Sequence, residues 1–209
     1  MSPAQRRALT ELWPRYGLSC EGTVFDFAGI FGNENPVYLE IGFGMGGSLA
    51  QMAASHPDYN YLGIEVHRPG VGTLLNRIHD GQLANLRVMN SDAVDIITDC
   101  IGPGSLTGVL IFFPDPWMKK RHHKRRLVQA PLITALRERL QTGGILHLAT
   151  DWEDYAQHML AVMQQIEGMR NIAGDGLYAE RPAYRPLTKY EARGERLGHA
   201  VRDLIFERG

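Results

Sequence analysis

The chain has 209 residues and a formal net charge of −1 at pH 7. Its 44% apolar and 22% charged residues are ordinary for a soluble globular protein, and the length suits one α/β domain with a sizeable core. No window reaches the run of about 18 apolar residues that a membrane span requires, and the N-terminus lacks the apolar core of a signal peptide. These observations exclude a membrane-spanning class.

Strand and helix patterns alternate along the chain from residue 37 onward. Short apolar runs predict strands at 37–41, 61–65, 86–89, 108–113, 145–150 and 200–207. Apolar residues at helical spacing predict helices at 48–54, 70–79, 93–100, 127–140 and 152–166. The helix pattern at 127–140 stops before Gly143-Gly144, and we interpret this glycine pair as its C-terminal stop.

This alternation with short connections predicts an α/β fold with a doubly wound, mainly parallel sheet. The strand at 108–113 is the most apolar of the set, so we expect it at the centre of the sheet. We expect a single domain over residues 1–209, with a helical lead-in at 1–36 and a substrate-side loop region at 173–199.

The chain contains two cysteines, Cys20 and Cys100. They are far apart in the sequence and have neither a metal-binding nor a redox-motif spacing. A reduced, cytoplasmic setting is the simplest interpretation. The eight histidines likewise show no ligand spacing, so no metal site is expected.

A glycine-rich loop follows the first predicted strand, from Glu40 to Gly47. Glycines at this position permit positive φ angles and let backbone amides approach a ligand closely. Gly42, Gly44 and Gly47 also fit the dinucleotide fingerprint G-x-G-x-x-G, so the glycines by themselves leave the ligand open. A tight strand-to-helix turn without a ligand is the structural alternative.

Three acidic residues stand at the ends of successive predicted strands: Glu40, Glu65 and Asp92. The carboxyl ends of parallel strands form the binding edge of such a sheet, and an acid at the second strand can accept hydrogen bonds from ribose hydroxyls. Each acid alone has a structural alternative, and Asp92 before Ala93 is a candidate helix N-cap. Together they favour a cationic adenosine ligand such as S-adenosylmethionine over a pyrophosphate.

The most informative segment is Phe112 to Arg126, FFPDPWMKKRHHKRR. Six of its last eight residues are Lys or Arg, and without them the other 201 residues carry a formal charge of −7. Concentrated positive charge beside a rigid, carboxylate-bearing turn indicates a polyanionic partner. A solvated basic loop without a partner is the alternative.

Several segments together resemble the bacterial tRNA (guanine-N7)-methyltransferase family, in order from about Val37 to Arg208. They are LEIGFGMGGSLAQMA, GIEVHRPGVG, FFPDPWMKKRHHKRR, ATDWEDYAQHML and RPLTKYEARGERLGH. The glycine loop is generic to class I methyltransferases, whereas the PDPW-basic run and the TKYE segment are more specific. Members of this family usually carry a basic segment before the first helix, whereas this chain begins at Met1-Ser2-Pro3, either as a shortened homologue or as a trimmed sequence. If that segment helps to hold RNA, we expect weaker RNA binding with an intact methyl-transfer site.

The resemblance implies a Rossmann-like class I methyltransferase fold, with a seven-stranded sheet whose C-terminal strand is antiparallel. It implies S-adenosylmethionine contacts from Glu40, Gly42, Gly44, Glu65, Asp92 and Asp115, and a catalytic role for Asp115. It implies substrate or RNA contacts from Lys119, Arg121, His122, His123, Lys124, Arg125, Arg126, Asp151, Thr188, Lys189, Tyr190 and Glu191. In this family the target is a guanosine in the tRNA variable loop, at position 46.

Guanine N7 carries an in-plane lone pair and no proton, so its methylation needs no prior deprotonation. We therefore expect Asp115 to orient the guanine and stabilise its developing positive charge, with general-base work secondary. The prolines on both sides of Asp115 restrict the turn that holds it. Asp151 follows the fifth strand, where it could hold the guanine or simply cap the next helix.

Three alternatives remain open on the residues alone. An NAD-dependent oxidoreductase would use the same glycine loop, but it leaves PDPW and the basic run unexplained. A non-catalytic RNA-binding protein with a methyltransferase fold has no need of four acids at strand ends, and a small-molecule methyltransferase has no need of the basic run. We expect tRNA as the partner, no membrane association, and a monomer by default, with a homodimer as the alternative.

Overall fold

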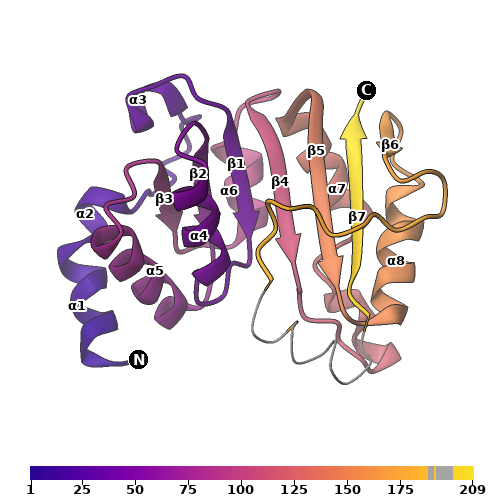
Figure 1. The fold of residues 1–209 in the computed structure, drawn as a ribbon, viewed down its shortest axis with the longest axis horizontal. Coiled ribbons are helices and arrows are strands. Elements are labelled where there is room, and N and C mark those ends of the chain that lie inside the picture. Colours follow the sequence, from indigo (N-terminus) through magenta and orange to yellow (C-terminus); the bar gives the residue numbers. More distant parts are fainter. Residues whose placement is uncertain (188–190, 192–199) are drawn as a thin grey trace.

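The computed structural model describes residues 1–187, 191 and 200–209. Its sheet has seven strands in the order β3-β2-β1-β4-β5-β7-β6 (Figure 1). The strands are β1 Val37–Ile41, β2 Asn60–Ile64, β3 Leu86–Met89, β4 Leu106–Phe112, β5 Leu140–Thr150, β6 Met169–Asn171 and β7 Arg202–Arg208. β1 to β5 pair in parallel, and β7 runs antiparallel between β5 and β6. This confirms the predicted mainly parallel α/β sheet with an antiparallel C-terminal strand.

Helices cover both faces of the sheet (Figure 1). They are α1 Pro3–Glu11, α2 Trp13–Tyr16, α3 Phe27–Phe31, α4 Gly47–Ser55, α5 Arg68–Asp80, α6 Ala93–Asp99, α7 Ala130–Arg139 and α8 Glu153–Met163, with a 3₁₀ helix, η1, at Lys120–Arg125. One apolar core packs α6, α7 and α8 against the sheet, and a second packs α1, α4 and α5 against the other face. The lead-in at 1–36 therefore supplies helices to the same layers.

The central position of β4 is confirmed, because it is the fourth strand of the seven. Six of its seven residues are buried, which explains the uninterrupted apolar run in its sequence. The prediction for Gly143-Gly144 is wrong, since α7 ends at Arg139 and both glycines lie inside β5. Leu140 is a buried strand residue that pairs with Leu106, and Gly143 at φ +77° accommodates the irregular register between β4 and β5.

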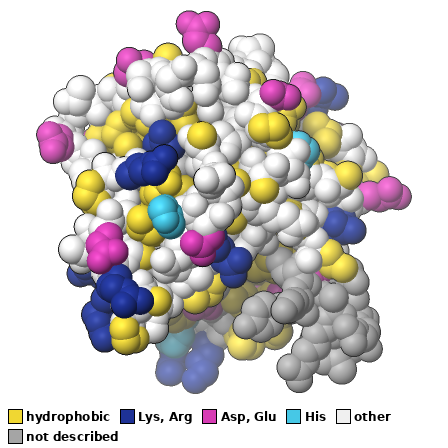
Figure 2. All heavy atoms as spheres, turned by 60° about the vertical axis from the view of Figure 1, so that its left-hand side comes forward, with side chains coloured by type: hydrophobic (Ala, Val, Ile, Leu, Met, Phe, Trp, Pro, Cys, Tyr) yellow, Lys and Arg dark blue, Asp and Glu magenta, His cyan; other side chains and the backbone are white. Residues whose placement is uncertain are grey.

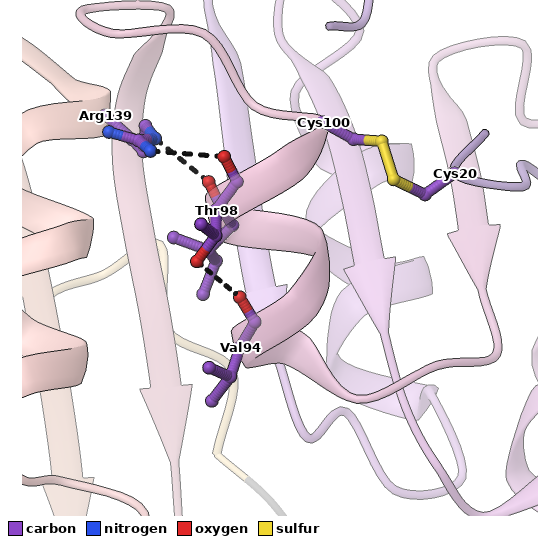
Figure 3. Close-up of a disulfide and its surroundings, with 6 residues drawn as sticks. Cys20, Val94, Thr98, Cys100 and Arg139 are labelled. Atoms are coloured by element: carbon purple, nitrogen blue, oxygen red, sulfur yellow. Dashed lines mark hydrogen bonds between the residues drawn. A yellow bond between two sulfur atoms is a disulfide. The ribbon is translucent and has the colours of Figure 1, made fainter. Parts of the chain in front are cut away.

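The sequence predicted reduced cysteines, and the structure instead joins them. Cys20 and Cys100 form a disulfide with Cα atoms 5.9 Å apart (Figure 3). Cys100 lies directly after α6, and its carbonyl accepts a hydrogen bond from Phe25 N at 2.8 Å, which brings the segment before α3 beside it. Arg139 holds the same end of α6 through Ile97 O at 2.9 Å and Thr98 O at 3.4 Å. The disulfide could not be predicted from the sequence, because the two cysteines are 80 residues apart and only the fold brings them together.

Replacement of Cys20 by serine is expected to lower the free energy of unfolding by about 2–4 kcal/mol under non-reducing conditions. The bond closes a loop with a sequence separation of 80, and its loss restores conformational freedom to the unfolded chain. Urea denaturation with and without a thiol reductant measures the difference. With reductant, wild type and Cys20→Ser should unfold at similar midpoints; equal midpoints without reductant would contradict the prediction.

Candidate active site

A cavity opens at the carboxyl ends of β1 and β4, where the strand order reverses from β2 on one side of β1 to β4 on the other. This switch point is the usual ligand site of an open α/β sheet. The cavity is lined by Glu40, Gly42, Phe43, Gly44, Ser48, Phe112, Phe113, Asp151, Arg185, Pro186 and Glu191. Five predicted site residues thus line this cavity: Glu40, Gly42, Gly44, Asp151 and Glu191.

Glu40 is the most unusual member of the cavity lining. It is 4% exposed, and its Oε2 has no hydrogen-bond partner among the described residues. Burial, with a smaller contribution from nearby Glu65, raises the pKa of Glu40 to about 8. A buried carboxyl without a partner is costly unless a ligand supplies a donor or a positive charge. Glu40 is therefore suited to a cationic or hydrogen-bond-donating ligand group.

The glycine loop has the backbone that the sequence predicted. Gly42 and Gly44 lie at φ +76° and +59°, in the left-handed region that favours glycine. A Cβ at either position would meet no atom within 4 Å, so the conformation, and not crowding, requires glycine. Open space beside both residues leaves the backbone accessible to a ligand in the cavity.

A second hollow continues from the first, and the two share Gly42. Its lining is Ile41, Gly42, Ile64, Glu65, Val66, Ser91, Asp92, Ala93 and Leu127. Glu65 accepts hydrogen bonds from Gly44 N at 2.8 Å and His67 N at 2.9 Å, which fixes its carboxylate beside the loop. Asp92 is the N-cap of α6 and accepts from Val94 N at 2.9 Å, so the cap prediction is confirmed. The combined space suits an elongated ligand with a charged end at Glu40.

Asp115 lies in the turn after β4, two residues beyond the cavity-lining Phe113. Its carboxylate is exposed, and Oδ1 accepts from Trp117 N at 3.0 Å. Asp115 is not itself part of the cavity lining. Phe113 and Trp117, on either side of the Pro-Asp-Pro sequence, have φ angles of +51° and +45°. Such conformations cost non-glycine residues about 1–3 kcal/mol each and are frequent at functional sites.

The basic run forms an exposed surface next to this turn. Lys119 precedes η1, which holds the rest of the run up to Arg125. Five cations of the run are exposed: Lys119, Lys120, Arg121, Lys124 and Arg125. The Arg125 guanidinium stacks over the Trp117 ring at 5.0 Å, and the His122 ring meets the same indole edge-on at 5.8 Å. Figure 2 shows Lys and Arg side chains scattered over the face that it presents, including Lys, Arg and His side chains at its lower edge, below the level at which β1, β4 and β5 end in Figure 1.

Arg126 differs from the rest of the run. It is 3% exposed, and Nε donates to Pro116 O at 2.9 Å. Its Nη2 pairs with Asp154 in the first turn of α8, and the guanidinium lies 4.8 Å from the centre of the Tyr155 ring. The sequence predicted an RNA contact here, but these partners occupy the side chain within the protein. In this structure Arg126 joins the Pro-Asp-Pro-Trp turn to α8.

The remaining predicted substrate residues fall into two groups. Asp151 is exposed and lines the cavity, and it is not the N-cap of α8, because Trp152 holds that position. Glu191 is buried at the cavity and pairs with Arg185. Thr188, Lys189 and Tyr190 lie outside the described residues.

Sequence reasoning missed a polar cluster beside the cavity, formed by the buried residues His147, Arg185 and Asp203 and the half-buried Tyr184. His147 lies within the apolar run of β5 (ILHLA), and Asp203 directly precedes the apolar run of β7 (LIF). A charged or polar residue within or next to an apolar run was the available signal, because such a side chain needs a partner when it is buried.

No three His, Cys, Asp or Glu side chains gather as a metal site within the described part of the chain. Among the same residues, no helix is long and apolar enough to cross a membrane.

The comparisons with known proteins agree with the geometry. A family model described as "Putative methyltransferase" matches residues 34–204. The tRNA (guanine-N(7)-)-methyltransferase of Hydrogenovibrio crunogenus is 54% identical, with 100% of this chain and 87% of that protein covered. The enzyme of the same name from Pasteurella multocida is 52% identical, with 99% and 81% covered.

Solved structures show the same fold at low sequence identity. The 16S rRNA methyltransferase KamB has a TM-score of 0.64 at 14% identity, over 89% of this chain and 95% of that one. Streptococcus mutans SMU.1697c, solved in complex with SAH, has a TM-score of 0.56 at 10% identity, over 84% and 89%. These neighbours establish a Rossmann-like methyltransferase fold. With relatives above 50% identity along its whole length, the chain belongs to the tRNA (guanine-N(7)-)-methyltransferase family.

Proposed function

We propose that this protein transfers the methyl group of S-adenosylmethionine to N7 of a guanosine in tRNA, at position 46 of the variable loop. The observation that carries the proposal is the buried carboxyl of Glu40 beside the glycine loop, whose Oε2 has no hydrogen-bond partner among the residues that the structure describes. It faces a cavity that continues to Glu65 and Asp92, and an exposed basic run stands beside the same sheet edge. The names of the relatives supply the nucleoside and the RNA.

The residues of the two hollows fit S-adenosylmethionine, which supplies an electrophilic methyl on a sulfonium when bound. Glu40 would face the ammonium end, where a positive charge compensates its burial. Glu65 would accept from the ribose hydroxyls, and Asp92 would meet the adenine edge above the apolar side chains of the second hollow. A pyrophosphate would instead bring negative charge toward Glu40 and Glu65, which disfavours NAD.

The protein then has to position guanine N7 in line with the methyl group and stabilise the cationic product ring. Asp151 and Glu191 line the cavity, and their carboxylates are acceptors for the guanine N1–H and exocyclic amine. Asp115 would add negative charge on the turn after β4. No residue has to remove a proton from N7 before attack.

The exposed basic run would hold the RNA phosphates. We expect the double variant Lys120→Gln, Lys124→Gln to weaken tRNA binding and to reduce the slope of log affinity against log salt by roughly 1.5, because each lost phosphate contact removes about 0.7–0.9. Filter binding over a potassium chloride series measures both quantities. Arg170→Gln, an exposed cation paired with Glu207 away from the run, is the matched control and should leave the slope unchanged. An unchanged slope in the double variant would favour a solvated loop.

The decisive assay incubates the protein with S-adenosylmethionine and unmodified tRNA and searches the digested nucleosides for 7-methylguanosine by mass spectrometry. A transcript with guanosine 46 replaced by adenosine is the substrate control. Formation of 7-methylguanosine on the first transcript only is the expected result. Donor binding without methyl transfer would overturn the proposal in favour of a non-catalytic RNA-binding protein.

A further inference from the structure

A buried ionic cluster connects the cavity to the C-terminal strand. Arg185 directs all three guanidinium nitrogens at two carboxylates, Glu191 and Asp203. Nη1 and Nη2 donate to the two Glu191 oxygens at 2.8 and 2.6 Å. Nε and Nη2 donate to the two Asp203 oxygens at 2.6 and 2.9 Å. Arg185 is 1% exposed, so this double bidentate arrangement lies in the protein interior.

His147 and Tyr184 complete the cluster. His147 Nε2 lies 2.7 Å from Asp203 Oδ1, and the Tyr184 hydroxyl lies 2.9 Å from His147 Nδ1. Burial lowers the pKa of His147 despite the nearby carboxylate, so the ring is neutral at pH 7. With the hydroxyl donating to Nδ1, the ring donates from Nε2 to Asp203. The cluster then contains one cation and two carboxylates and fixes the orientation of Asp203.

The same arginine contacts the end of β4. Its guanidinium carbon lies 5.9 Å from the centre of the Phe112 ring and 5.6 Å from that of Phe113. Both rings line the cavity, and Phe113 is the residue at φ +51° that leads into the turn carrying Asp115. Arg185 thus touches the predicted substrate residue Glu191 and the strand end before the predicted catalytic turn, while Asp203 anchors it to β7.

We propose that Arg185 is a positioning residue for methyl transfer, which holds Glu191 and Phe113 in the geometry that the reaction needs. This inference rests on the proposed function. Arg185 acts through its neighbours and not on the reacting atoms. Lysine at this position keeps the positive charge but lacks the planar fork that engages two carboxylates at once, so geometry and charge can be separated. Small displacements of positioned groups lower rates by up to about 100-fold.

The test compares wild type with Arg185→Lys at saturating S-adenosylmethionine and tRNA. We expect the single-turnover rate to fall about 10- to 100-fold, with the dissociation constant for the methyl donor within about threefold of wild type. Arg170→Lys, which conserves charge at the exposed Arg170–Glu207 pair, is the matched control and should retain the wild-type rate. A rate within twofold of wild type in Arg185→Lys would overturn the inference, as would an equal loss of donor affinity in a variant that keeps the wild-type melting temperature.

A second variant keeps the test decisive if Arg185→Lys does not fold. Asp203→Asn preserves the shape of the anchor and removes its charge, and its single-turnover rate should fall at least about fivefold. An unchanged rate would then overturn the inference. The rate ratio is measured on whichever RNA nucleoside the wild type methylates, so a different product would contradict the proposed function while the ratio still tests Arg185. A wild type that methylates no RNA would overturn both.

Discussion

Replacement of Asp115 by asparagine is expected to lower the single-turnover rate of methyl transfer about 100-fold or more, with little change in donor affinity. Removal of one preorganised electrostatic group from a transition state costs about 10²- to 10³-fold in rate. Asparagine keeps the side-chain oxygen that accepts from Trp117 N at 3.0 Å, so the turn should survive. The variant therefore removes the charge that would stabilise the developing cationic guanine.

Rapid-quench kinetics at saturating donor and tRNA measure this rate. Asp115→Ala provides the comparison, because it removes the charge and also the hydrogen bond to Trp117. We expect the alanine variant to be at least as slow and the asparagine variant to retain the wild-type melting temperature. Full turnover in Asp115→Asn would rule out charge stabilisation by this residue.

Replacement of Glu40 by glutamine is expected to weaken S-adenosylmethionine binding about 10- to 100-fold. Each unit by which a bound cation lowers the pKa of Glu40 corresponds to about a tenfold gain in affinity, and glutamine cannot provide this gain. With its pKa at about 8, Glu40 is mostly protonated at pH 7 in the protein without donor. A cation bound beside it favours the carboxylate, so binding should release roughly one proton. Affinity in the wild type should therefore rise between pH 6 and pH 8 relative to the variant.

Titration calorimetry in buffers of different ionisation enthalpy counts the released protons. The difference between wild type and Glu40→Gln isolates Glu40 from the titration of the ligand's own amine. Equal proton release in the two proteins would show that Glu40 does not face the bound cation.

Glu40 should also affect the stability of the protein without donor, but with the opposite pH dependence: donor affinity rises with pH, whereas the contribution of Glu40 to the free energy of unfolding falls. The folded pKa of Glu40, about 8, exceeds its ordinary value of 4.5, so the folded state binds more protons between these values. The contribution of Glu40 to stability is thus greatest below pH 4.5 and declines as pH rises toward 8. In urea denaturation, Glu40→Gln should remove this decline.

The sequence was sufficient to predict the parts of the molecule that depend on local pattern. The apolar runs identified six of the seven strands, and β6 was missed because its three residues are too few to form a pattern. The glycines between the first predicted strand and the helix pattern that follows it identified the loop at Gly42 and Gly44. Because parallel strands end at one edge, acids that follow successive strands had to gather there, and Glu40, Glu65 and Asp92 do so.

Burial and partner choice could not be predicted from the sequence, because they depend on residues brought together from distant segments. Arg126 belongs to the basic run, yet Asp154 and Pro116 hold it in the interior. Glu191 lines the cavity, as a substrate residue should, but its pairing with Arg185 was not predicted.

The sequence by itself determined the α/β sheet, the glycine loop, the acids at the strand ends and the concentration of positive charge after β4. These follow from short-range periodicity and from the chain order of strands. Tertiary structure alone decided the disulfide between Cys20 and Cys100, the raised pKa of Glu40 and the Arg185 cluster. Each of these requires close contact between segments that are distant in the sequence, and such contact exists only after the sheet and its helices have assembled.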